Sequence, residues 1–137
     1  MLHIACNSNH NKNVDLKSIA STQQIPSHYL SKILQLLVRQ KLLISMKGPT
    51  GGYQLAREAD SITLLDVIEV IDGLDAFSKC GIFNGACNEK HQCSIHEHYR
   101  KSMEDIRQLY KDAKVNTYKS MIDECDCNEL TTIIKNF

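Results

Sequence analysis

The chain has 137 residues, 42% of them hydrophobic, which suffices for one domain of ordinary size with or without an appendage. Its 16 basic and 16 acidic residues balance, which excludes a strongly basic fold and restricts any nucleic-acid contact to a local patch. No apolar stretch approaches ~20 residues, so nothing spans a membrane, and the first residues lack the basic and apolar regions of a secretory signal. We expect a cytoplasmic protein with reduced thiols and no membrane partner.

Residues 1–39 carry the signals of three helices. A short apolar fragment covers residues 1–7. Asp15 can cap a second helix, which Pro26 ends because proline cannot continue a helix interior. Ser27 then caps a third helix, whose apolar residues have the spacing of one buried helical face: Leu30, Ile33, Leu34, Leu37 and Val38. Two helices joined by a short turn predict a helix-turn-helix.

The residues that follow predict a small β-wing. Residues 42–46 and 52–56 have the pattern of two strands, and the Gly/Pro-rich residues 47–52 between them indicate a turn. A hairpin directly after a helix-turn-helix makes a winged helix. Thr63 and Asp66 then have the spacing of a capping box at the start of another helix.

A segment rich in cysteine and histidine follows Gly73, which suits the end of that helix. Its pattern is C-x6-C-x5-C-x2-H, formed by Cys80, Cys87, Cys93 and His96. Thiolate and imidazole ligands together select zinc or an iron–sulfur cluster over magnesium or calcium. Structural zinc sites usually use tighter cysteine pairs. A thiol–disulfide switch without metal is the third interpretation.

A long helix is predicted from about His96 to Asn116. Its larger side chains have heptad spacing, which is typical of a helix that packs on a partner helix. These residues are Tyr99, Met103, Ile106, Tyr110 and Ala113. The pattern is short, so packing within the helix's own subunit stays an alternative to a homodimer interface.

The expected fold is mainly α with a small β-wing. We divide the chain into a winged helix-turn-helix DNA-binding domain (1–72), a Cys-rich loop (73–95), a dimerisation helix (96–118) and a C-terminal tail (119–137). The tail contains two further cysteines, Cys125 and Cys127.

The chain resembles the Rrf-two family of bacterial winged-helix repressors, which includes IscR-like and NsrR-like iron–sulfur branches. The resemblance is carried by residues 18–20, 25–34, 47–56 and 62–68 and by the Cys/His set. Together these cover most of residues 15–116. The wing phrase over 47–56 and the cysteine spacing are specific when they occur together.

The resemblance implies a DNA-binding transcriptional repressor, not an enzyme, that acts on double-stranded DNA as a homodimer. Cys80, Cys87, Cys93 and His96 would hold an iron–sulfur cluster that senses redox state, nitric oxide or iron–sulfur status, and the imidazole ligand favours [2Fe–2S] over [4Fe–4S]. The expected DNA contacts lie on the recognition helix and the wing. They are Ser27, His28, Tyr29, Ser31, Lys32, Gln35, Arg39, Lys47, Thr50 and Arg57. For Tyr29, packing inside the domain is an equal alternative.

The chain departs from the family pattern in three places. Met1 falls where the middle of the family's opening helix would be, which predicts a shortened N-terminus or a misassigned start. The first cysteine spacing is slightly looser than in the IscR-like branch, and the Cys125/Cys127 pair is not part of the pattern. The alternative function is a cofactor-free or zinc-bound regulator of the same fold that uses a thiol switch or another effector.

Overall fold

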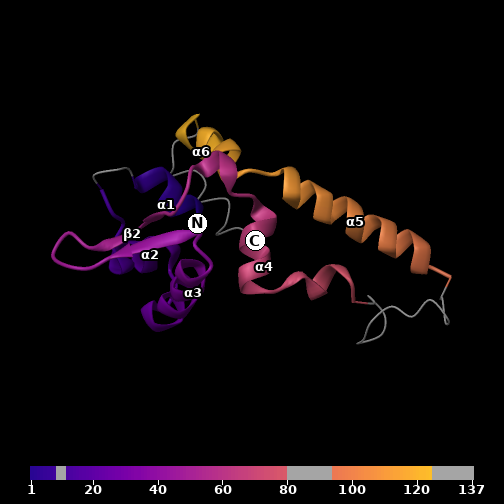
Figure 1. Ribbon diagram of the computed structural model, residues 1–137, viewed down its shortest axis with the longest axis horizontal. Coiled ribbons are helices and arrows are strands. Elements are labelled where there is room, and N and C mark those ends of the chain that lie inside the picture. Colours follow the sequence, from indigo (N-terminus) through magenta and orange to yellow (C-terminus); the bar gives the residue numbers. More distant parts are fainter. Residues whose placement is uncertain (9–11, 80–93, 125–137) are drawn as a thin grey trace.

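The computed structural model describes residues 1–8, 12–79 and 94–124. Figure 1 shows a body built from the N-terminal helices and the hairpin, with α5 extending away from it and α6 returning to it. The elements are α1 (Leu2–Asn7), α2 (Leu16–Gln23), α3 (Ser27–Arg39), β1 (Leu43–Met46), β2 (Gly52–Leu55), α4 (Leu64–Ile71), α5 (His96–Asp112) and α6 (Val115–Glu124), with 3-10 turns η1 (Ala59–Ser61) and η2 (Leu74–Phe77). Within these described ranges, no helix is long and apolar enough to cross a membrane. The predicted fold class, mainly α with a small β-wing, is confirmed.

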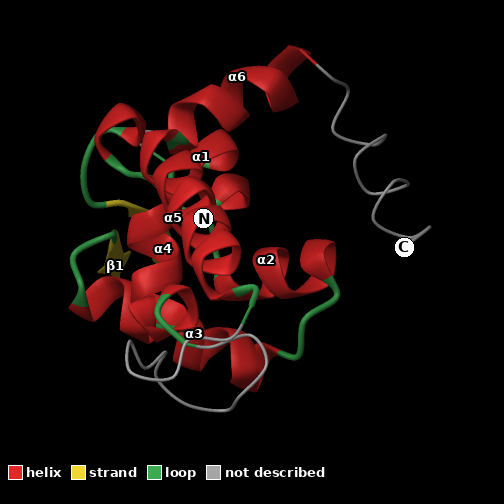
Figure 2. Ribbon diagram, turned by 90° about the vertical axis from the view of Figure 1, so that its right-hand side faces the viewer, coloured by secondary structure: helices red, strands yellow, loops and turns green. Residues whose placement is uncertain are grey.

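The core lies between α1, α2, α3 and the start of β1. On α3, Leu30, Leu34 and Leu37 are buried, as their spacing predicts, and each such side chain contributes about 1.5–3 kcal/mol by leaving water. The other buried apolar residues are Ile4, Ala5, Val14, Ile19, Ala20, Leu42, Leu43, Ile62 and Val115. Figure 2 places α3 and α6 on opposite sides of this core. Burial of one face of α3 leaves its opposite face to solvent.

The wing is an antiparallel hairpin in which Leu43 pairs with Leu55 and Met46 with Gly52. The predicted strands and turn are confirmed. Gly52 has φ +150°, and a Cβ there would lie 2.6 Å from the Val14 backbone oxygen. Glycine therefore permits the close approach through which Val14 joins the hairpin.

Two predicted helix caps form. The Asp15 carboxylate accepts from the Ser18 N–H at 2.9 Å. Thr63 and Asp66 form the full capping box, with reciprocal bonds of 3.1 and 2.9 Å. The prediction for Ser27 was wrong: Pro26 occupies the N-cap and Ser27 is the first helical residue, without a side-chain cap bond. Proline accounts for this, because its restricted φ suits a position at the start of a helix.

The long helix ends earlier than predicted. The expected helix over 96–118 stops at Asp112, and Ala113 is extended with φ −74° and ψ 104°. The Ala113 carbonyl accepts from the Leu64 N–H at 2.8 Å, and the Val115 N–H donates to the Ile62 carbonyl at 2.9 Å. These long-range bonds take the place of the bonds of a further helical turn. The helix α5 therefore ends, and a separate helix, α6, begins at Val115. The expected boundary at 118/119 therefore falls inside α6, which packs against α1 and η1.

The capping box gives a stability prediction. Replacing Thr63 with Ala removes the hydroxyl that accepts from the Asp66 N–H, so the free energy of unfolding should fall by about 1 kcal/mol. Urea denaturation followed by circular dichroism measures the change. Thr63→Ser keeps the hydroxyl and is the control. Equal losses in the two variants would contradict a capping role.

Candidate nucleic-acid interface

The turn between α2 and α3 is set by three consecutive residues. Gln24 adopts the left-handed conformation with φ 52° and ψ 36°, which ends α2. The Ile25 N–H donates to the Ala20 carbonyl at 3.0 Å, and Pro26 begins α3. A left-handed residue followed by this backward bond is a common way to close a helix C-terminus. The turn directs α3 across α2 in the helix-turn-helix arrangement.

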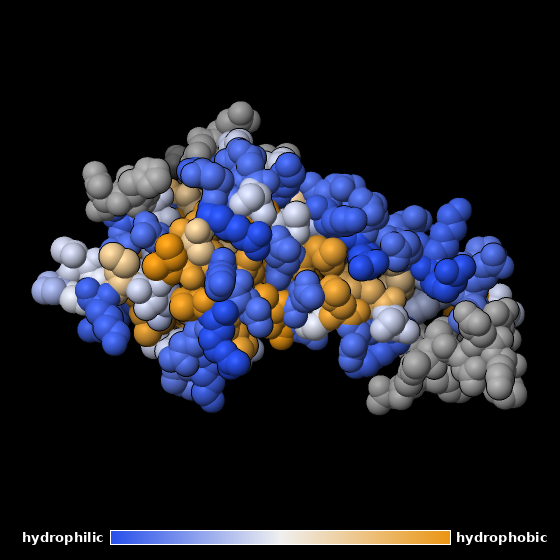
Figure 3. Space-filling view, viewed as in Figure 1, coloured by the Kyte–Doolittle hydropathy of each residue, from blue (hydrophilic) through white to orange (hydrophobic). Residues whose placement is uncertain are grey.

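The outer face of α3 carries most of the predicted DNA contacts. Tyr29 is 56% exposed, so the alternative in which it packs inside is excluded. Ser31 is half-buried. The exposed predicted residues are Ser27, His28, Tyr29, Lys32, Gln35 and Arg39. In Figure 3 the surface over α3, at the lower left, is hydrophilic, whereas apolar side chains gather toward the middle of the molecule.

The wing tip supplies two more predicted contacts, Lys47 and Thr50, both exposed. The hairpin projects from the body on the side away from α5 (Figure 1). Asn13 Nδ2 donates to the Thr50 backbone oxygen at 2.9 Å. Val14 then exchanges two backbone bonds with Tyr53, at 3.0 and 2.9 Å. The segment before α2 thus braces the wing from its tip to its middle, a role that the sequence patterns had not indicated.

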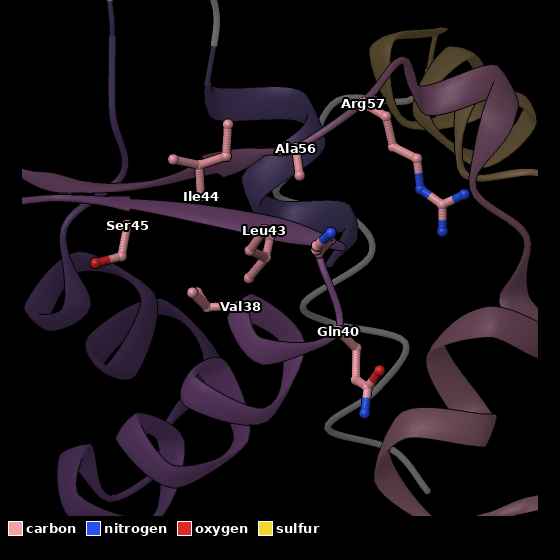
Figure 4. A pocket seen from close by; sticks show the side chains of 8 residues that line it. Val38, Gln40, Leu43, Ile44, Ser45, Ala56 and Arg57 are labelled. Atoms are coloured by element: carbon pink, nitrogen blue, oxygen red, sulfur yellow. The ribbon is translucent and has the colours of Figure 1, made fainter.

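Arg57 lies apart from the other predicted contacts. It follows β2 at the end of the hairpin opposite the tip, and Figure 4 shows its side chain directed away from the strands. Its Nη2 lies 3.8 Å from Asp66 Oδ2, and both side chains are partly exposed. The structure therefore places Arg57 near α4 and separates it from the tip residues.

Charge is segregated along the chain. Residues 16–57 contain no Asp or Glu, and all sixteen acidic residues lie elsewhere. Their six basic residues, all exposed, are Lys17, Lys32, Arg39, Lys41, Lys47 and Arg57. Lys17 and Lys41 were not among the predicted contacts, because the balanced charge of the whole chain conceals this segment. The segment of the helix-turn-helix and wing therefore carries the local excess of basic residues that a neutral chain needs to approach phosphate.

The candidate cluster ligands fall mostly outside the described residues. Cys80, Cys87 and Cys93 lie there, while His96 is the first residue of α5 and only 8% exposed. Among the residues that the structure describes, no group of three or more His, Cys, Asp or Glu side chains could hold a metal ion. The donor set itself, three thiolates and one imidazole, fits an iron–sulfur cluster and also fits zinc. His96 begins the helix that follows the three cysteines, as the spacing predicts.

The α5 residues predicted to form the dimer interface, here called the dimer stripe, divide into two groups. They are Tyr99, Met103, Ile106, Tyr110 and Ala113. The Tyr110 ring packs edge-on against Phe77 of η2, with centroids 6.2 Å apart, and α5 packs on α4 and η2. Tyr99 and Met103 are half-buried. Ile106 is 38% exposed, and Leu109, which the heptad pattern missed, is 59% exposed.

Ala113 contributes differently from the rest of the stripe. It ends α5 in an extended conformation and bonds to α4 through its backbone. Part of the stripe therefore packs within its own subunit, and the apolar surface left outside is centred on Ile106 and Leu109.

Comparison with known proteins identifies the family. Residues 1–117 match the Rrf2 family model, described as an iron-dependent transcriptional regulator. An HTH-type transcriptional regulator of Aquifex aeolicus (strain VF5) is 30% identical over 105 residues, which cover 75% of this chain and 73% of that protein. IscR of Klebsiella pneumoniae (strain 342) is 33% identical over 77% of this chain and 64% of its own length. CymR of Bacillus subtilis (strain 168) is 43% identical over 58 residues, 42% of each protein. The sequence matches thus span less than two thirds of IscR and less than half of CymR.

Solved structures give the same fold. CymR (YrzC), described as the global cysteine regulator of B. subtilis, has a TM-score of 0.74 at 24% identity and covers 88% of this chain and 87% of its own. IscR of T. potens has a TM-score of 0.65 at 26% identity and covers 84% of this chain and 74% of its own. The helix-turn-helix, the wing and the match over residues 1–117 agree: the chain belongs to the Rrf2 family of winged-helix transcriptional regulators.

Proposed function

We propose that the chain is a repressor that binds double-stranded operator DNA as a homodimer and whose affinity is controlled by an iron–sulfur cluster. The observation that carries the DNA-binding part is the acid-free segment 16–57, which contains the exposed face of α3 and the wing. The N-terminal turn of α3, with Ser27, His28 and Tyr29, is suited to base edges in the major groove. Lys32, Arg39 and Lys47 are suited to phosphates, to which we add Lys17 on α2.

The homodimer is supported by the exposed apolar residues on α5. Ile106 and Leu109 lie one helical turn apart, on a helix that extends away from the body (Figure 1). Large apolar side chains that gather on one surface indicate a protein contact. A two-fold pair of recognition helices would read two half-sites of the operator.

Cluster control is proposed for Cys80, Cys87, Cys93 and His96. When bound, a cluster supplies a redox- and nitric-oxide-reactive centre. The buried position of His96 at the start of α5 links that centre to the helix. From there, α5 packs on α4, and α4 packs on α3, so a shift of the Cys-rich loop has a contiguous route to the recognition helix. Coupling of ~1–3 kcal/mol would change operator affinity about 5- to 150-fold.

A zinc-bound or cofactor-free thiol switch is the second candidate. It is favoured by the structural similarity to CymR, which is described as a cysteine regulator. The same thiols would then respond by forming a disulfide or by binding zinc. The two candidates differ in colour, iron content and sulfide content.

The brace under the wing gives the first functional prediction. Asn13→Ala removes the bond to the Thr50 carbonyl and should weaken operator binding about fivefold, the equivalent of about 1 kcal/mol. Fluorescence anisotropy with labelled operator measures the affinity. Asn7→Ala is the matched control, because the Asn7 amide donates to the His3 carbonyl within α1, away from the wing. An equal effect of the two substitutions would contradict the brace.

The phosphate contacts give the second prediction. Lys32→Ala should weaken binding to specific and unrelated DNA alike, and should reduce the slope of log affinity against log salt by about 1 per bound subunit. Lys101→Ala on α5, also exposed but outside residues 16–57, should leave the slope unchanged. A slope that responds to Lys101 and not to Lys32 would place the DNA on another surface.

The ligand set gives the third prediction. Protein purified without oxygen should absorb visible light and contain iron and acid-labile sulfide in equal amounts, two of each per chain for [2Fe–2S]. Cys87→Ala should lose the colour and change operator affinity, while Cys125→Ala should keep both. Unchanged colour and affinity in Cys87→Ala would rule the proposal out. A colourless protein that still binds operator would support the thiol or zinc alternative.

A further inference from the structure

Arg57 lies at the boundary between two segments of opposite charge. The acid-free segment 16–57 ends with it, and residues 58–78 contain six acidic residues and no Lys or Arg. The six are Glu58, Asp60, Asp66, Glu69, Asp72 and Asp75. A phosphate group that approached Arg57 would therefore also approach the negative charge of the residues that follow it.

The Arg57 side chain faces α4, and the wing tip lies at the other end of the hairpin. Its Nη2 lies 3.8 Å from Asp66 Oδ2, and the two side chains are 46% and 35% exposed. Figure 4 shows the Arg57 side chain directed away from the strands. Because the carboxylate offsets part of the guanidinium charge, Arg57 attracts a phosphate less strongly than a basic residue at the wing tip does.

The Asp66 carboxylate holds two points of the chain at once. Its Oδ2 also accepts from the Thr63 N–H at 2.9 Å, within the capping box of α4. Arg57 and Thr63 are the two ends of the segment 57–63, which connects β2 to α4. Ile62 in this segment is fully buried. One carboxylate oxygen thus joins the root of the wing, residues 56–57, to the start of α4.

An open groove of about 770 Å³ lies beside the root of the wing. The end of α3, β1 and residues 56–57 line it. The Ala56 N–H donates to the Leu42 carbonyl at 3.1 Å, which joins the two ends of the hairpin to each other. That bond does not set the angle between the hairpin and α4. Since the groove leaves this side of the root open, the contact between Arg57 and Asp66 is suited to set that angle.

We propose that Arg57 is a positioning residue, which fixes the wing relative to α4 through Asp66, and that it is not a phosphate contact. The inference deepens the proposed function and rests on it for the effect on operator affinity. It also gives the wing a connection to the end of α5, because Thr63, on the same carboxylate, pairs with Lys114.

Operator affinity measured over a series of salt concentrations separates a positioning role from a phosphate contact. Arg57→Gln should weaken binding about two- to fivefold, the range for a partly exposed ion pair, and leave the slope of log affinity against log salt unchanged. Asp66→Asn removes a negative charge, yet it should weaken binding by a similar factor because the wing loses the same contact. The double variant should bind no more weakly than either single variant. Lys47→Gln at the wing tip is the reference and should reduce the slope by about 1 per bound subunit.

The variants are chosen to separate the ion pair from the helix cap. Asp66→Asn keeps a side-chain oxygen that can accept from the Thr63 N–H. Thr63→Ala is the matched control, because it removes the other cap bond and leaves the Arg57–Asp66 pair in place. Its operator affinity should equal that of the unmodified chain. Equal weakening in Thr63→Ala and Asp66→Asn would overturn the proposal, since it assigns the effect to the start of α4.

Two other results contradict a positioning role. A slope reduced by about 1 in Arg57→Gln, or tighter operator binding in Asp66→Asn, indicates a phosphate contact that Asp66 weakens.

A chain that bound no operator would refute the proposed function and leave this inference to amide NMR without DNA. The amide shifts of Lys47 and Thr50 should change in Arg57→Gln and in Asp66→Asn, and they should stay the same in Thr63→Ala. Wing amide shifts that stay unchanged in all three variants would refute the positioning role independently of DNA binding.

Discussion

Burial of one face of α3 is the constraint on which the remaining structure depends. Leu34 and Leu37 are each 2% exposed, and Leu42 and Leu43, just after the helix, are 1% and 2% exposed. These residues fix the rotation of α3 about its axis and the point at which β1 leaves the core. The polar face of α3 and the position of the wing follow, because both are attached to the same buried residues. A helix turned by one residue would bury Ser31 and Gln35 in place of Leu30 and Leu34, at a cost that the domain could not offset.

A second constraint connects α5 to this body through backbone bonds. Residues 113–115 lie beside residues 62–64, with Ala113, Lys114 and Val115 pairing with the segment that starts α4. The capping box of Thr63 and Asp66 lies in the same segment. The start of α4 is thus held by its cap and by the end of α5 together. Under the proposed function, a movement of α5 would reach α4 at this point, where backbone bonds and the cap restrict the chain.

Most local features of the fold were predictable from the sequence, with the cap expected at Ser27 as the exception, whereas features that arise from long-range contacts were not. The caps at Asp15 and Thr63 and the glycine turn of the wing depend on neighbours a few residues away, so the sequence reveals them. The end of α5 depends on bonds to residues 62–64, about fifty positions earlier. The spacing of apolar residues along the helix does not predict such bonds. The packing of Tyr110 within its own subunit depends on Phe77, again distant in sequence.

The same limit applies to the candidate site. The exposed face of α3 followed from periodicity, whereas the brace from Asn13 to Thr50 joins residues 37 positions apart. The separation of Arg57 from the wing tip follows from its neighbour Asp66 on α4, which strand patterns do not show.

Charge segregation explains how a neutral chain can serve as a DNA-binding protein. The six basic residues of 16–57 face no acidic residue within their own segment, while the other ten basic residues share their part of the chain with all sixteen acidic ones. The rest of the molecule therefore carries a net negative charge, which the DNA backbone repels. Under the proposed function, attraction at the helix-turn-helix and repulsion elsewhere would together orient the protein on approach, within the Debye length of ~8–10 Å at physiological salt. The absence of acidic residues from 16–57 would then decide which face of the protein turns toward DNA. A balanced total charge is therefore compatible with DNA binding, and it favours binding through that one face.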